Sequence, residues 1–182
     1  MPPGTSPVTL AEAKAHLRVE SNDEDSEIQA FLDAAIKLIE DAYWLQLITA
    51  TWELKCDDFP DVIFTPRGPL QSATIQYVDG SGATQTLSPS AYTVDSSSFP
   101  GRILPAYGYC WPSTRCHINA VTVAMVNGFG DSADDIPQPI KNAVLILTGI
   151  LYENRGACGE DMPPIIDTFM SPYRKTYARS TV

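Results

Sequence analysis

The sequence is poor in positive charge. Its 182 residues contain 12 Lys and Arg against 22 Asp and Glu, which gives a formal net charge of −10. No cluster of Lys and Arg occurs before Tyr173-Arg174-Lys175, near the C-terminal end. Tight nucleic-acid binding normally requires a basic patch that displaces counterions from the phosphates. The composition therefore argues against a dedicated nucleic-acid-binding protein, whereas an acidic wall past which DNA slides without adhering is compatible with it.

Long hydrophobic runs are also lacking. The most apolar stretch, residues 143–151, is too short to span a bilayer. The first eight residues, Met1-Pro-Pro-Gly-Thr-Ser-Pro-Val8, have neither the basic nor the apolar region of a signal peptide. We therefore expect synthesis and assembly in a cytoplasm, no membrane association, and reduced thiols at the four cysteines.

Patterns typical of catalysis or metal binding are weak. Cys110 and Cys116-His117 could be metal ligands, but five residues separate the two cysteines, and zinc sites use closer pairs. Paired carboxylates at 57–58, 134–135 and 160–161 fall in loops or at a helix start, where solvation or the helix dipole explains them. No Gly-x-Ser-x-Gly motif is present. We expect no catalytic residue, no metal and no cofactor.

Three segments have helical periodicity, and we expect helices over about residues 9–18, 25–46 and 137–155. Thr9 and Glu12 have the spacing of a capping box at the start of the first. Asp25 or Ser26 is the expected cap of the second, whose apolar residues follow the i, i+3, i+4, i+7 spacing. The third is apolar almost all the way round. Such a helix must be covered on several sides, and we expect part of the cover to come from another subunit.

Between the second and third helices, the period of the apolar residues changes from 3.6 to 2. Trp52, Leu54 and Cys56 alternate with polar residues, which is typical of a half-buried strand. Similar short segments follow near residues 62–64, 75–77, 85–87, 92–94, 102–104 and 120–126. The sequence therefore predicts an α+β fold: a bundle of about three main helices with a small antiparallel β-domain, about 50–127, inserted between the second and third. Residues 1–156 would form the main domain, and 157–182 an extended or partly helical tail.

Several fragments, taken in order, resemble a known family. They are Val8-Thr-Leu-Ala-Glu-Ala-Lys-Ala-His-Leu-Arg18, Thr51-Trp-Glu-Leu54, Pro69-Leu-Gln-Ser72, Tyr92-Thr-Val-Asp95, Gly101-Arg-Ile-Leu-Pro105, Trp111-Pro112, Asn127-Gly-Phe-Gly130 and Leu151-Tyr-Glu-Asn-Arg155. Over about residues 8–155 the chain is similar to the head–tail connector proteins (adaptor or head-completion proteins) of long-tailed bacteriophages and prophages.

This resemblance implies a structural, non-enzymatic subunit of a ring, typically of twelve copies, in the neck of a virion. The ring would lie under the portal protein, contact tail or stopper proteins, and give transient, non-specific passage to the double-stranded DNA that it helps to retain. The family has no catalytic residues to carry over. A ring of identical, heterologous contacts also fits the apolar third helix. The expected subunit-interface residues are Trp111, Ile140, Val144, Leu147 and Leu151. The expected portal-docking residues are Phe169, Met170, Tyr173, Arg174, Lys175 and Tyr177.

Two other functions are compatible with the sequence. A tail-completion or tail-terminator protein would have the same structural character but a different place in the virion. A small cytoplasmic enzyme or ligand-binding domain would require a deep pocket lined by titratable groups with perturbed pKa values.

Overall fold

The computed structural model describes residues 5–154 and 162–174, so Lys175 and Tyr177 lie outside the described residues. The chain divides into two compact units, each described here by itself. The described part of the helical unit is residues 5–48, 129–154 and 162–174, and that of the β unit is 49–128. All seven strands come between the second and third helices in the sequence, and the mixture of helices and antiparallel sheets confirms the α+β class.

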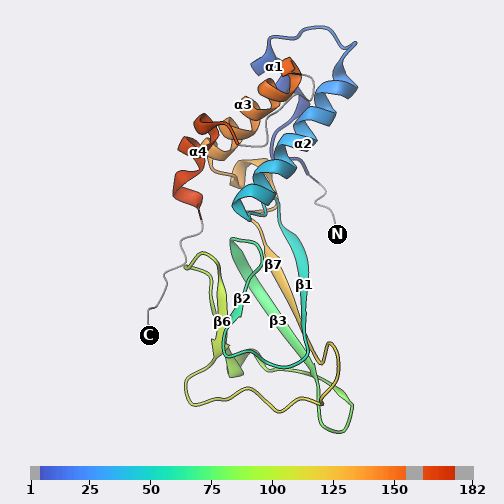
Figure 1. Cartoon of the computed structure of the whole chain (residues 1–182), viewed down its shortest axis with the longest axis vertical. Helices are drawn as coiled ribbons and strands as arrows, with labels where there is room; N and C mark the ends of the chain where they lie inside the picture. The colour runs from blue at the N-terminus through green and yellow to red at the C-terminus, as the bar shows by residue number, and fades with distance from the viewer. Residues whose placement is uncertain (1–4, 155–161, 175–182) are drawn as a thin grey trace. The chain divides into compact units, whose positions relative to one another are not determined.

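The helical unit begins with α1 (Leu10–Leu17), which Figure 1 labels. The predicted capping box at its start is confirmed. The backbone N–H of Thr9 donates to the Glu12 carboxylate at 2.7 Å, and the Glu12 N–H donates to the Thr9 hydroxyl at 3.2 Å. The Thr9 hydroxyl also donates to the Glu12 carboxylate at 2.7 Å. The two bonds that Thr9 donates to this carboxylate hold the pKa of Glu12 below its ordinary value, because the charged carboxylate is the better acceptor. Arg18, in the left-handed conformation, ends the helix.

Helix α2 (Asp25–Tyr43) begins where it was expected, but its cap residue and its end differ from expectation. Glu24 takes the N-cap position without a side-chain cap bond. The Asp25 carboxylate instead accepts a bond from the Lys14 ammonium at 2.6 Å, which ties α1 to the start of α2. The helix ends at Tyr43 rather than near residue 46, because Trp44 adopts a left-handed φ of 57°. The turn directs Leu45 and Leu47 into the core.

Helix α3 (Gln138–Asn154) packs against α1, α2 and α4 (Pro164–Met170). Ile140, Val144, Leu147 and Leu151 are 0%, 0%, 3% and 7% exposed. The expectation that this helix needs another subunit for part of its cover is therefore corrected for these four side chains. Helices of the same chain already cover them, so they offer a second copy little surface.

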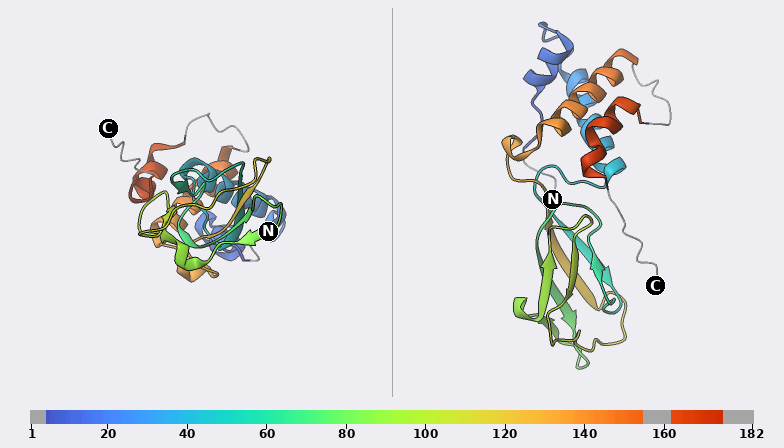
Figure 2. Two further views of the ribbon diagram at one scale, coloured as in Figure 1. Left: turned by 90° about the horizontal axis from the view of Figure 1, so that it is seen from below. Right: turned by 90° about the vertical axis from the view of Figure 1, so that its left-hand side faces the viewer.

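The β unit has two antiparallel sheets, and the expected strand segments are confirmed. The four-stranded sheet has the order β1-β7-β3-β4 and the three-stranded sheet the order β2-β6-β5. Figure 2 shows the strands of this unit, in green to yellow, from two further directions. The bounds are β1 Ala50–Cys56, β2 Ile63–Phe64, β3 Leu70–Val78, β4 Thr84–Thr86, β5 Tyr92–Asp95, β6 Arg102–Pro105 and β7 Val121–Asn127.

The core of the β unit is formed by side chains from both sheets. Its buried members are Ile63, Leu70, Ile75, Tyr92, Ile103, Val121, Val123 and Met125. Burying a side chain of this size contributes about 1.5–3 kcal/mol relative to leaving it in water. One face of the four-stranded sheet therefore belongs to the core, and alternation directs the intervening residues outward. Within the described residues, no helix is both long enough and apolar enough to cross a bilayer.

Candidate interaction surfaces

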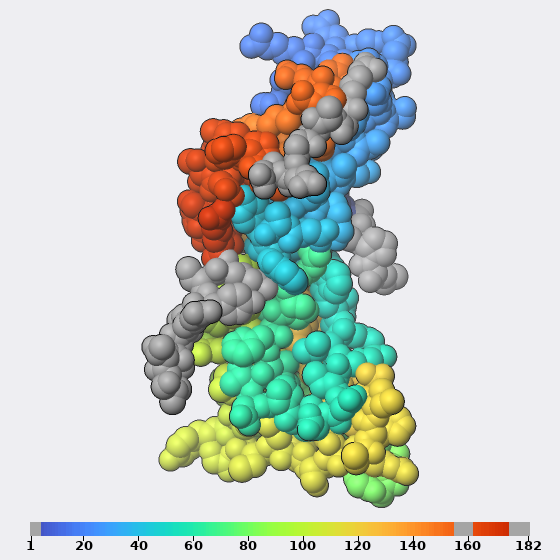
Figure 3. Space-filling model, in the orientation of Figure 1, coloured from blue at the N-terminus to red at the C-terminus, as the bar shows by residue number. Residues whose placement is uncertain are grey.

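Residues 106–119, which make up nearly all of the long loop between β6 and β7, form the most distinctive surface of the β unit. Three of the seven large hydrophobic side chains exposed in the described part of the chain are on it: Tyr107 (105%), Tyr109 (55%) and Ile118 (71%). Loops of this length without secondary structure are uncommon in compact domains and are often functional. Figure 3 shows this segment, in yellow-green to yellow, at the molecular surface.

This loop is attached to the β unit at several points. The Trp111 ring stacks on Phe59 with 4.8 Å between centroids, and Phe59 meets Tyr77 edge to face at 5.8 Å. The backbone N–H of Arg115 donates to the Val78 carbonyl at 3.0 Å. Trp111, an expected subunit-interface residue, thus packs against the core of its own β unit. Its indole N–H is buried without a hydrogen-bond partner.

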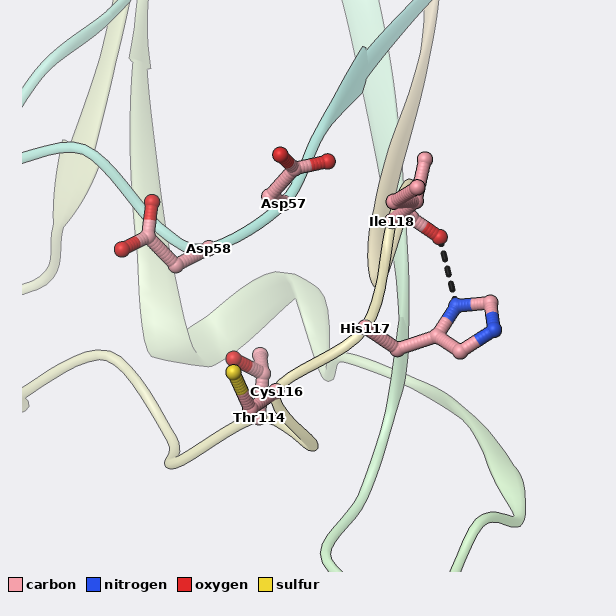
Figure 4. Close-up of a pocket in the computed structure, with 6 residues that line it drawn as sticks. All are labelled: Asp57, Asp58, Thr114, Cys116, His117 and Ile118. Atoms are coloured by element: carbon pink, nitrogen blue, oxygen red, sulfur yellow. Dashed lines mark hydrogen bonds between the residues drawn. The ribbon is translucent and has the colours of Figure 1, made fainter.

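A hollow of about 470 Å³ lies beside the second half of the loop (Figure 4). Asp57, Asp58, Thr114, Cys116, His117 and Ile118 line it. The Asp57 carboxylate accepts the Asn119 N–H at 2.9 Å, and His117 Nδ1 lies 2.6 Å from the Ile118 carbonyl oxygen. Cys110 and Cys116 are exposed free thiols. Among the residues that the structure describes, no three His, Cys, Asp or Glu side chains are arranged to hold a metal ion.

The second candidate surface is the C-terminal segment of the helical unit. Met170 and Ile166 are fully buried, which corrects the expectation that Met170 is available for portal docking. Phe169 is partly exposed. Tyr173 packs edge to face on Phe129 with 6.0 Å between ring centroids.

An ionic contact centred on Asp167 fixes this segment. Its Oδ1 accepts the Tyr43 hydroxyl at 2.5 Å and the Arg174 guanidinium at 2.7 Å. Both bonds lower the pKa of Asp167, because both donors favour the charged carboxylate. Burial, reinforced by the same carboxylate, raises the pKa of Tyr43. Arg174, an expected portal-docking residue, is therefore an exposed cation with an ion-pair partner in its own chain.

Charge is divided unequally between the two units. The described residues of the helical unit include 14 Asp and Glu against 5 Lys and Arg, a net charge of −9. The described residues of the β unit include 6 against 4, a net charge of −2. Five of the carboxylates of the helical unit fall between residues 20 and 27. The repulsive field toward a phosphate backbone therefore originates mainly in the helical unit.

The sequence did not reveal which of its aromatic residues would be exposed. Tyr107 and Tyr109 were not among the expected interface residues, although the length of their loop was a usable signal. The Asp167 contact joins residues 124 positions apart, and no local pattern predicts such a pairing. Of the expected docking residues that the structure describes, Phe169, Tyr173 and Arg174 keep exposed surface.

Comparison with known proteins gives two kinds of match. The family model described as "Phage gp6-like head-tail connector protein" matches residues 7–72. No curated protein matches the chain significantly.

Among solved structures, a chain of the "virion of native gene transfer agent (GTA) particle" shares the fold with a TM-score of 0.80 at 21% identity, over 99% of this chain and 95% of that one. A chain from the "neck of empty GTA particle computed with C6 symmetry" has a TM-score of 0.77 at 22% identity, over 99% and 95%. A third, from the "neck of native GTA particle computed with C12 symmetry", has a TM-score of 0.74 at 22% identity, over 94% and 90%. The family-model match over residues 7–72, together with a fold shared over nearly the whole chain, confirms the resemblance to phage head–tail connector proteins.

Proposed function

We propose that this protein is a structural subunit of the neck of a phage or phage-like particle, where twelve copies form the head–tail connector ring. The observation that carries the proposal is the shared fold over 99% of the chain with a virion protein, joined to the connector-family match at residues 7–72. The role is structural and not enzymatic. The described surface offers aromatic residues and a fixed C-terminal helix for contacts, and the hollow beside the loop 106–119 is open.

The ring would join the portal protein to tail or stopper proteins. A C12 neck containing a chain of the same fold supports twelve copies. Heterologous contacts between identical copies close into such a ring when the rotation between neighbours closes. On the portal side, the docking surface would be the exposed part of the segment 169–174, with Lys175 and Tyr177 as further candidates by sequence.

The acidic character suits the passage of DNA. A connector ring surrounds double-stranded DNA without reading its sequence, and a surface that attracted phosphates would slow the transit. The helical unit, with a net charge of −9 over its described residues, would supply the repulsive part of the wall. The same ring would help to retain the packaged DNA.

The proposal is tested by deleting the gene and examining the particles by negative-stain electron microscopy. Loss of a connector leaves heads, full or leaking, without attached tails. Tails of abnormal length on otherwise complete particles would indicate a tail-terminator protein instead. Particles of normal appearance would refute both structural functions.

A further inference from the structure

We propose that the tip formed by Tyr107 and Tyr109 of one copy packs on the outer face of the four-stranded sheet of the next copy in the ring. The inference rests on the proposed function, because it assumes that identical copies lie side by side. It assigns the contact between neighbours to the β unit. The residues of α3 that were expected to form this interface are buried in their own chain.

The outer face of the four-stranded sheet carries almost no charge. Strands β7, β3 and β4 contain no Asp, Glu, Lys or Arg at all. The register sets Glu53 of β1 opposite Ala124 of β7, and Ala124 opposite Thr74 of β3. The remaining outward positions of β7, β3 and β4 are small or neutral: Ser72, Gln76, Val78, Thr84, Thr86, Thr122 and Val126.

The charged side chains of this face are on the edge strand β1, and they neutralise each other. Glu53 and Lys55 of β1 lie 3.9 Å apart. Solvent-facing protein surface typically consists of roughly a quarter to a third charged residues. A sheet face without net charge is therefore unusual in a chain with a net charge of −10, and depletion of charge is the compositional mark of an interface core.

The tip of the loop has a matching character. Residues 106–119 include no Asp or Glu, and their one Lys or Arg is Arg115. Tyr107 is entirely exposed and Tyr109 more than half exposed. Tyrosine is enriched in interfaces because its large ring loses few rotamers when it is fixed. The stacking of Trp111 on Phe59 anchors the loop from which both tyrosines project.

Charge indicates a second copy as the occupant of the face. DNA would require cations on the face, and a basic protein would require carboxylates. Neighbouring copies, each with a net charge of −10, repel one another except where carboxylates are absent. A heterologous ring contact needs two different surfaces on each copy. The sheet face and the loop tip are two such surfaces on one unit.

The area of the face sets how much of the contact it can supply. Strands β1 and β7 have 7 residues each, β3 has 9 and β4 has 3. With strands about 4.8 Å apart and a rise of about 3.4 Å per residue, the face presents roughly 400 Å². A stable interface buries about 800 Å² on each partner. The sheet face and the tip together therefore form a substantial part of the contact between neighbours, and the helical unit is free to supply the rest.

A disulfide experiment tests the adjacency directly. Cys110 is an exposed free thiol next to Tyr109, and Thr74 is exposed on the sheet face. In the Thr74→Cys variant of the full chain, oxidation with diamide should join Cys110 of one copy to the new thiol of the next. A ladder of covalent oligomers should then appear on a non-reducing gel. Burial, with the adjacent Asp57 and Asp58, raises the pKa of the Cys56 thiol and makes it a slower competitor.

Two controls isolate the proposed contact. Thr93→Cys places the same thiol at an exposed position of β5 in the other sheet, and it should give no more ladder than the unmodified protein. Adding Cys110→Ser to Thr74→Cys should abolish the ladder. A second test needs no disulfide and compares the variants Thr74→Glu and Thr93→Glu. Thr74→Glu should abolish ring formation and Thr93→Glu should not. Both variants should keep the circular dichroism spectrum of the folded protein.

The outcomes separate this inference from the proposed function. If the unmodified protein forms rings on the portal, but Thr74→Cys gives no Cys110-dependent ladder and Thr74→Glu still assembles, the assigned contact is wrong while the connector function stands. If the unmodified protein forms no ring either alone or with its portal, the proposed function fails and the contact fails with it.

Discussion

Replacing Leu147 with alanine tests whether α3 belongs to the core of a single copy. Leu147 is 3% exposed, on a helix packed against α1, α2 and α4. Truncating such a leucine removes its burial energy and leaves a cavity, which together cost about 2–5 kcal/mol. Since small domains are stable by only about 5–15 kcal/mol, the helical unit should lose a large fraction of its stability.

The assay is urea unfolding followed by the helical circular dichroism signal, at a low and a high protein concentration. The stability loss of Leu147→Ala should be the same at both concentrations, because the partners of the side chain are in the same chain. Leu145→Ala is the matched control, since Leu145 is on the same helix but only half-buried, and its loss should be smaller. The opposite result is that, at low protein concentration, Leu147→Ala unfolds at the same urea concentration as the unmodified subunit and loses stability only at concentrations at which rings assemble. That result would refute the reasoning.

Three further predictions concern local contacts. Thr9→Ala removes the cap of α1 and should cost about 1 kcal/mol in the unfolding of the helical unit, with Thr5→Ala as a control outside the capping box. Asp167→Asn should speed hydrogen exchange in α4, whereas Asp41→Asn, in a surface pair, should not. The pKa of Asp167 is lower in the folded state than its ordinary value of 3.8. The stabilisation that its ionised carboxylate gives is therefore present above pH 3.8 and is lost as the pH falls through the pKa of the folded state. Hydrogen exchange in α4 should rise in acid for this reason. Gly101→Ala would place a Cβ 2.7 Å from the Leu70 Cβ and should cost about 1–3 kcal/mol in the β unit, while Gly80→Ala, with open space around it, should be neutral.

Local patterns predicted the elements that depend on neighbouring residues. The capping box at Thr9 and Glu12 is confirmed because it needs only residues three apart. The alternation of Trp52, Leu54 and Cys56 predicted the half-buried strand β1, since each second residue of a strand faces the core. These signals fixed the fold class and most of the strand positions.

The contacts between distant segments were not predictable in the same way. The apolar surface of α3 showed that the helix must be covered, but nothing local indicated that α4, carrying Ile166 and Met170, supplies part of the cover. The end of α2 was misplaced because the left-handed position is occupied by Trp44 instead of the usual glycine or asparagine. Exposure of Tyr107 and Tyr109 likewise depends on how their loop is anchored, by Trp111 on Phe59.

The most direct test of the connector function is the mass of the assembly that the purified protein forms on its own portal. Mass photometry of the mixture should show the portal mass increased by about twelve times the 19.8 kDa subunit, in agreement with a twelvefold neck ring. A chain that stays at the subunit mass and leaves the portal peak unchanged would contradict the account.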